Sequence, residues 1–446
     1  MPLTFSNDDH HPLLDTLLRT RVPRWEALNR AVDERDDMLD FAMKLFHGDR
    51  DAALVNYFQN GLEQFELVKH IASWRGPMRR MLDFASGYGR LTRFLVHQQL
   101  ADEITVSDIL EGGMEFQARE FGVRTILSAT APTDFLPGSR ATGQPGSPGY
   151  DLIFVASLFT HLPPATFTPW LRRLVELLEP RGLLVFSVHD ESIAPENVGE
   201  GINFAAHSES RVLDTSEYGS TWVTESYVRE QVAAIGAGLA CVRLPRALAE
   251  WQDVYVVSPS PIENARPRRA PKGFIEHCDT AADGILLTGW ATVADEAPDR
   301  VEVRIDDEIV ATARAFHPRD DVAKAFGPGA RDSGWDCLVP HSAVRSFRYQ
   351  TATVSIVSSV GVERILFLGT IDAATGFVAR ERARARDNQI VARDAENAEL
   401  RERIAILEHQ RAELERTIAA MRNSRFWRAR ERWFALKRGL RITNEQ

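Results

Sequence analysis

The chain has 446 residues, enough for about three domains of roughly 150 residues each, and its 44% hydrophobic and 26% charged residues are ordinary for a folded globular protein. Its net charge of −10 disfavours a general nucleic-acid binder, which needs a basic face, so we expect no nucleic-acid partner. Three widely spaced cysteines, Cys241, Cys278 and Cys337, form no CxxC pair, which predicts neither a metal site nor a disulfide framework.

The N-terminal stretch MPLTFSNDDHHPLLD is acidic and lacks the run of about 7 to 15 apolar residues that a signal peptide needs. No run approaches the roughly 18 apolar residues that span a bilayer. We therefore expect a cytoplasmic protein that is neither exported by a signal peptide nor transmembrane.

Residues 1–75 are predicted to form a helical lead-in. Apolar residues recur there at intervals of three and four, the spacing of one helix face. They are Met38, Phe41, Leu45 and Phe46, then Leu54, Phe58, Leu62 and Phe65.

Residues 76–260 are predicted to form an α/β domain with a Rossmann-like sheet. Short apolar runs alternate there with stretches of helical length, which indicates βαβ units and a mostly parallel sheet. The runs are MLDFA, EITVSD, RTIL, DLIFVAS, GLLVFSV and DVYVVS. Residues 261–273 follow as a proline-rich linker without apolar periodicity.

Residues 274–373 are predicted to form a small antiparallel β-sandwich, because period-2 runs such as GILLTGWATV and TATVSIVS follow one another without helical stretches between most of them. Residues 380–422 are predicted to form a coiled coil. Four heptads keep one register, with Ile390, Asn397, Ile404, Arg411 and Ile418 at position a and Leu400, Leu407, Leu414 and Met421 at position d.

A homo-oligomer through this coiled coil is favoured over one long helix folded back on its own protein, and dimer and trimer both stay open. The tail, residues 423–446, places four aromatic side chains among seven Arg and Lys residues. Such a helix is typical of peripheral contact with a membrane surface, here the inner face of the cytoplasmic membrane. The alternative is a tail helix whose aromatic rings pack on the protein's own body.

The stretch LDFASGYGR, residues 82–90, suggests a ligand site. A strand that ends in Asp83 and turns through Gly87 and Gly89 lets the backbone approach a ligand where a Cβ would collide. The next predicted strand ends in Asp108, where a carboxylate takes the ribose hydroxyls of a nucleoside. The two features together predict a cofactor that contains adenosine.

The turn favours S-adenosylmethionine over NAD. A pyrophosphate-binding turn continues to a third small residue, but Thr92 stands at that position. In addition, Asp83 would repel a diphosphate and suit a positively charged amino acid moiety.

At this point the sequence resembles the class I S-adenosylmethionine-dependent methyltransferases, over residues 79–257. LDFASGYGR is similar to their first motif, an acidic residue followed by x-G-x-G, with Ala85 where glycine is common, and DLIFVASLFTHLPPATFTPWLRRLVELLEPRGLLVFSVHD resembles their fourth strand, following helix and next turn. The resemblance implies a cofactor site in which Asp83, Gly87 and Gly89 hold the methionine portion, Asp108 the ribose, and Ile109 and Ala129 the adenine. Ala85 and Ala156 complete the predicted cofactor-binding set.

Two histidines are candidates for the catalytic base, because methyl transfer to a hydroxyl group benefits from a proton acceptor of near-neutral pKa. His161 follows the fourth predicted strand and His189 the fifth. Each has a structural alternative, such as fixing a loop through hydrogen bonds. Tyr218, Thr221 and Asp253 are candidates for the acceptor side, and ordinary packing explains them equally well.

The remaining parts suggest an acceptor. The segments LLTGWATV and SGWDCLVP are similar to accessory β-sandwich domains of bacterial glycosyltransferases, and the coiled coil with its tail resembles the ends of proteins that assemble cell-surface polysaccharide. The resemblance implies an O-methyltransferase for a sugar of such a polysaccharide or of its lipid-linked precursor, with a glycosyltransferase as a partner. Three rivals stay open: an NAD-dependent sugar-modifying enzyme, a non-catalytic scaffold that recruits glycosyltransferases, and a protein methyltransferase.

Overall fold

The computed structural model divides into two units, Met1–Ala374 and Thr375–Gln446. It describes residues 6, 9, 11–135, 149–195, 198–199, 201–206, 214–266, 270–294, 296–359 and 361–374 of the first unit, and residues 376, 378, 400–401, 403–404, 406–416, 419 and 425–442 of the second.

Helices begin the first unit, as the apolar spacing predicts. They are α1 (Pro12–Arg21), the 3-10 turn η1 (Trp25–Ala27), α2 (Asp37–Leu45) and α3 (Arg50–Ala72). The carboxylate of Asp36 caps α2 by accepting from the backbone N–H of Met38, and Asp49 caps α3 in the same way.

The apolar face of α3 is buried, with Leu54, Phe58, Leu62 and Phe65 at most 3% exposed. Helix α2 buries Leu39 and Ala42, but the face formed by its predicted residues Met38, Phe41 and Leu45 is not buried, since these are 43%, 53% and 52% exposed.

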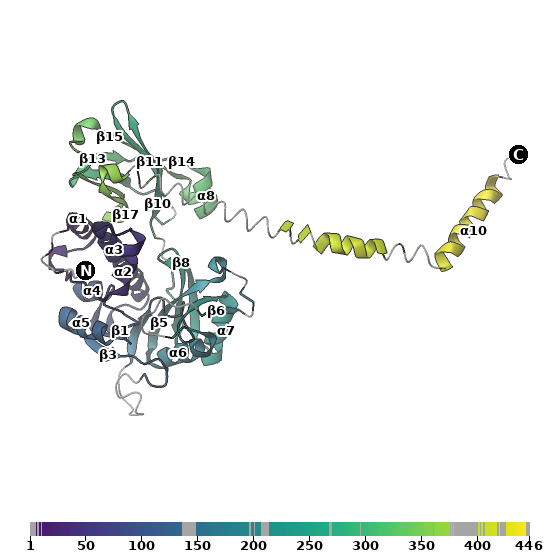
Figure 1. The fold of residues 1–446 in the computed structure, drawn as a ribbon, viewed down its shortest axis with the longest axis horizontal. Coiled ribbons are helices and arrows are strands. Elements are labelled where there is room, and N and C mark those ends of the chain that lie inside the picture. Colours follow the sequence, from purple (N-terminus) through teal and green to yellow (C-terminus); the bar gives the residue numbers. More distant parts are fainter. Residues whose placement is uncertain are drawn as a thin grey trace. The chain divides into compact units, whose positions relative to one another are not determined.

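A nine-stranded sheet forms the centre of the next part (Figure 1). Five parallel strands lie in the order β3-β2-β1-β4-β5. Their bounds are β1 Met78–Phe84, β2 Ala101–Asp108, β3 Arg124–Leu127, β4 Tyr150–Val155 and β5 Leu178–Asp190. The helices in this part are α4 Thr92–His97, α5 Glu111–Phe121, α6 Pro164–Glu176 and α7 Glu225–Ile235.

Four more strands extend the sheet, and three of them are absent from the six apolar runs of the sequence. They are β6 Ile202–Ala205, β7 Ser220–Val223, β8 Ala240–Leu248 and β9 Gln252–Ser258. β9 runs antiparallel to both β5 and β8, and β7 pairs in parallel with the end of β5. The sheet is therefore mostly parallel, as the apolar runs predicted, but it is mixed at this side. Strands β6 to β8 do not appear as apolar runs in the sequence, because few of their side chains are buried.

Two four-stranded antiparallel sheets follow, in the orders β10-β11-β15-β14 and β13-β12-β16-β17. Their strands are β10 Lys272–Ala281, β11 Gly284–Thr292, β12 Arg300–Ile305, β13 Glu308–Ala313, β14 His317–Pro318, β15 Asp332–Pro340, β16 Thr351–Ser358 and β17 Gly361–Thr370. The fully buried indole of Trp335 belongs to their core. A short helix, α8 (Asp320–Phe326), interrupts the strands and was not expected.

The described part of the second unit is helical, and includes α10 (Arg425–Ile442). Four of the predicted heptad residues, Leu400, Ile404, Leu407 and Leu414, are 52% to 63% exposed. Ile390, Asn397, Ile418 and Met421 lie outside the described residues, so the coiled coil stays a prediction. None of the helices in the described ranges of the chain combines the length and apolarity that crossing a membrane requires.

Candidate active site

The candidate site lies where the strand order of the sheet reverses. β1 pairs with β2 on one side and with β4 on the other, so the segments that follow β1 and β4 diverge and leave a crevice at the carboxyl ends of the strands. A cavity of about 930 Å³ opens at this point. Its volume is near the upper end of the roughly 300–1,000 Å³ usual for small-molecule sites.

The glycine turn after β1 is held to the end of β2 by Asp108. One carboxylate oxygen of Asp108 accepts from the N–H of Gly87 at 2.8 Å and the other from the N–H of Leu110 at 3.0 Å. The turn needs a left-handed backbone at Ala85, Gly87 and Gly89, with φ of 59°, 57° and 81°. Because a carboxylate oxygen accepts more than one hydrogen bond, Asp108 keeps acceptor positions for the hydroxyls of a ribose.

Asp83, at the end of β1, is 3% exposed, and burial raises the pKa of its carboxyl to about 7. The hydroxyl of Thr92 lies 3.1 Å from Asp83 and 2.7 Å from Oε1 of Gln117. Nε2 of Gln117 donates to the carbonyl of Gly87, which leaves Oε1 as an acceptor facing Thr92. Since one hydroxyl donates only one hydrogen, a proton on Asp83 completes both bonds. A bound cation would favour the ionised form instead.

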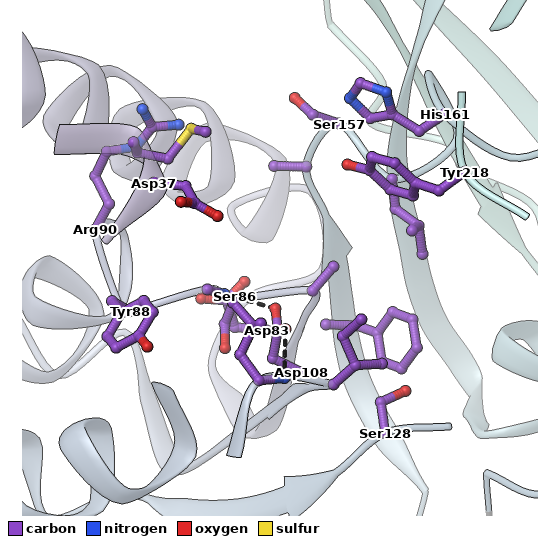
Figure 2. Close-up of a pocket in the computed structure, with 18 of the residues that line it drawn as sticks. Asp37, Asp83, Ser86, Tyr88, Arg90, Asp108, Ser128, Ser157, His161 and Tyr218 are labelled. Carbon is purple, nitrogen blue, oxygen red and sulfur yellow. Dashed lines mark hydrogen bonds between the residues drawn. The ribbon is translucent and has the colours of Figure 1, made fainter. Parts of the chain in front are cut away.

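Arg90 is a functional candidate to which the sequence assigned no role. Its side chain lines the cavity, and Figure 2 shows it extending toward α2. Burial lowers the pKa of its guanidinium. No hydrogen bond or ion pair joins that guanidinium to another side chain among the residues that the structure describes, which makes it suitable for a ligand carboxylate.

His161 and Tyr218 form the opposite wall of the cavity, above Asp83 and Asp108 in Figure 2. Their rings stack with centroids 4.4 Å apart. Nδ1 of His161 lies 2.6 Å from the carbonyl oxygen of Gly219, and the N–H of Gly219 donates to the carbonyl of His161. A carbonyl only accepts, so Nδ1 carries the proton, and in the neutral ring Nε2 is left as a proton acceptor.

His189 lies behind His161 and does not line the cavity. Burial, and to a smaller degree the neighbouring His161, lower its pKa to about 4. A ring with so low a pKa is a weak base, so the geometry favours His161 of the two candidates.

The acceptor-side candidates Thr221 and Asp253 have structural partners. The hydroxyl of Thr221 donates to the carbonyl of Leu162, and Asp253, which is 1% exposed, forms an ion pair with Arg243 at 2.6 Å. These contacts fix β7 to the segment between β4 and α6, and β8 to β9. Tyr218 alone of the three reaches the cavity.

The cavity brings together eight of the ten predicted site residues: Asp83, Ala85, Gly87, Asp108, Ile109, Ala129, Ala156 and His161. Gly89 and His189 are not among its lining residues. Like Arg90, the lining residues of α2 were assigned no functional role from the sequence, and neither were Ser128, Ser157, Trp170 and Glu217. The apolar spacing of α2 was the one available signal, but it indicates a helix without saying which face meets a ligand.

This fold and site are those of an α/β protein with a nucleoside-binding site at the point where the strand order of its sheet reverses. Residues 82–184 match the family model described as a methyltransferase domain. The chain accordingly contains a methyltransferase domain of the S-adenosylmethionine-dependent kind over these residues. No curated protein matches the chain.

Three solved structures show how distant the similarity is. A DhpI complex with S-adenosylhomocysteine is 18% identical over 50% of this chain and 96% of that one, with a TM-score of 0.34. A S-adenosylmethionine-dependent methyltransferase from Clostridium acetobutylicum ATCC 824 is 12% identical over 50% and 98%, with a TM-score of 0.35. CalS10, an amino pentose methyltransferase from Micromonospora echinaspora, is 14% identical over 44% and 91%, with a TM-score of 0.33.

Proposed function

We propose that the enzyme methylates a hydroxyl group of a sugar, in a cell-surface polysaccharide or its lipid-linked precursor. The observation that carries this proposal is the orientation of His161. Its protonated Nδ1 is held by the carbonyl of Gly219, and its stacking on Tyr218 fixes the ring beside the cavity. Nε2 can then take the proton of a hydroxyl group, which an oxygen nucleophile must lose.

The side chains of the cavity floor fit the proposed cofactor. Asp108 offers acceptor positions to the ribose, Ile109 and Ala129 line the space beside it for the adenine, and Asp83 and Arg90 suit the ammonium and carboxylate of the methionine end. When bound, S-adenosylmethionine supplies a methyl group to the acceptor oxygen, and the bond from that methyl carbon to sulfur breaks. The protein holds the acceptor in line and receives its proton on His161.

The charges of the cavity disfavour an anionic acceptor. Its lining has six carboxyl groups, from Asp36, Asp37, Asp40, Asp83, Asp108 and Glu217, and two basic side chains, from Lys44 and Arg90. With Arg90 assigned to the cofactor, Lys44 alone would face a phosphate. A diphosphate next to the methylated sugar is therefore disfavoured, and a terminal sugar far from any lipid diphosphate fits better.

The helices of the second unit support two further proposals, self-association of the chain and contact with a membrane surface. We infer that exposed Leu400, Ile404, Leu407 and Leu414 pair with a second copy of the chain in a coiled coil. Helix α10 has seven basic residues and one acidic residue, although the whole chain has a net charge of −10. Exposed Trp433 and Phe434 lie among these charges, which suits contact with an anionic membrane face, where a glycosyltransferase partner would also act.

The first experiment is calorimetric titration of the full chain with S-adenosylmethionine and with NAD, followed by transfer of radioactive methyl groups to a set of sugar acceptors. We expect S-adenosylmethionine to bind and NAD not to bind. His161→Gln should keep the cofactor affinity and lower kcat by about 10²-fold or more, since a general base contributes about 10²–10⁴. Binding of NAD alone would favour the oxidoreductase rival, and binding of neither would favour the scaffold. Unchanged kcat in His161→Gln would remove this histidine from the mechanism.

A further inference from the structure

One side of α2 packs into the core through Leu39 and Ala42, but a second apolar face, formed by Met38, Phe41 and Leu45, is exposed among the residues that the structure describes. Met38, Phe41 and Leu45 stand at positions i, i+3 and i+7, and about half of each side chain is exposed. The neighbouring helix α3 has the same kind of spacing, and it buries that face completely. Exposing three large apolar side chains side by side is unfavourable unless something covers them.

All three side chains line the cavity that also contains Asp83 and Asp108. Figure 2 shows α2, with Asp37, on the side of the cavity opposite to His161 and Tyr218, and Asp83 and Asp108 beneath both. The proposed cofactor occupies the floor. The space between α2 and His161 is left for the acceptor, so the apolar face borders the acceptor and not the cofactor.

We propose that this face of α2 binds an uncharged alkyl or aryl group that the acceptor carries near its methylated hydroxyl. The inference rests on the proposed function and adds the chemistry of the acceptor to it. The position of α2 is fixed by Asp36, which caps the helix and accepts from the hydroxyl of buried Tyr57 at 2.6 Å. The apolar face is thus presented by a rigid element, as a specificity surface should be.

A second copy of the chain is a poorer occupant of the same face. A stable interface buries about 800 Å² on each partner. Three half-exposed side chains on a helix of 9 residues supply only a part of that area. An anionic occupant is also disfavoured, because Asp37 and Asp40 lie on the same helix and line the same cavity.

The test uses the full chain saturated with S-adenosylhomocysteine and measures the Kd of octyl β-D-glucoside by displacement of the neutral fluorophore N-phenyl-1-naphthylamine. Methyl β-D-glucoside, which lacks the alkyl chain, is the control ligand. The variants are Phe41→Ser and Phe347→Ser, a matched control in the β-domain with 49% exposure against 53%. Burying half of a phenylalanine side chain is worth about a fivefold change in affinity.

We expect octyl glucoside to bind the native protein more tightly than methyl glucoside, and its Kd to rise about fivefold in Phe41→Ser and to stay unchanged in Phe347→Ser. Equal effects of the two variants would overturn the inference, and so would equal affinity of the native protein for the two glucosides. Dissociation of an oligomer by Phe41→Ser would overturn it in favour of a contact between copies. Unchanged affinity of the variants for S-adenosylhomocysteine shows that they are folded, whereas failure of the native protein to bind it would contradict the proposed function itself.

Discussion

Affinity for the cofactor should depend on pH through Asp83. The carboxyl of Asp83 has a pKa of about 7 without ligand, and its ionised form is the one that attracts an ammonium group. Raising the pH ionises Asp83 and therefore tightens binding. If only the ionised form binds, the Kd at pH 5.5 exceeds its limiting value by about thirtyfold, and at pH 8 it has nearly reached that limit.

The assay is calorimetry with S-adenosylhomocysteine, which has the same ammonium group, between pH 5.5 and pH 8. Asp83→Asn imitates the protonated carboxyl and can still bond to Thr92. We expect this variant to bind more weakly than the native protein at both pH values, by more than about thirtyfold at pH 8, and its Kd to change little between pH 5.5 and pH 8. Near pH 6 binding to the native protein should also release close to one proton, which buffers of different ionisation enthalpy reveal. A flat Kd in the native protein, or a pH dependence that Asp83→Asn retains, would refute the role of Asp83.

Three other changes test separate parts of the chain. A Cβ at Gly89 would lie 2.6 Å from Phe121 and 2.9 Å from Gln117, whereas at cavity-lining Gly87 it meets no atom within 4 Å. Both residues have positive φ, which costs alanine about 1–2 kcal/mol at either position. Because only the Cβ at Gly89 would also collide, Gly89→Ala should lower Tm more than Gly87→Ala, which should mainly weaken cofactor binding. Equal Tm values of the two variants would contradict this. Removing residues 380–446 should give a monomer in light scattering, and an unchanged oligomer would rule out assembly through the heptads. Removing residues 423–446 should abolish co-sedimentation with vesicles that contain anionic lipid, and added salt should abolish co-sedimentation of the full chain in the same way. If the shortened protein still binds the vesicles, another part of the chain makes the membrane contact.

The parts of the fold that follow from the sequence are those whose pattern is local. Strands β1, β2, β4 and β5 are buried, so each reads as an apolar run whatever its neighbours are. The turn through Gly87 and the carboxylate of Asp108 were also predictable, because a strand end followed by glycines indicates backbone that approaches a ligand. The hydrogen bond between them, which spans 21 residues, was implied by neither position alone.

The acceptor side follows from contacts that sequence patterns do not contain. His161 is oriented by Gly219, 58 residues later, and its stacking partner Tyr218 follows a segment without recognisable periodicity. The exposed apolar face of α2 has the same spacing as the buried face of α3, since periodicity reports the presence of a stripe and not what covers it. When a row of apolar side chains has the spacing of a core helix but is exposed beside a cofactor site, the difference between its pattern and its burial indicates that a ligand covers it.

The N-terminal helices belong to the catalytic unit, although the methyltransferase family match begins only at residue 82. Arg93, on the helix after the glycine turn, is 1% exposed, donates to the carbonyl of Ala31 at 3.1 Å and lies 3.4 Å from the hydroxyl of Tyr57. The same hydroxyl donates to Asp36, the cap of α2. Deleting residues 1–75 would leave a guanidinium without its buried partners, a loss that costs several kcal/mol. The helix that borders the acceptor and the turn that meets the cofactor are thus held by one buried network of Asp36, Tyr57 and Arg93, so a change in that network should affect both binding steps.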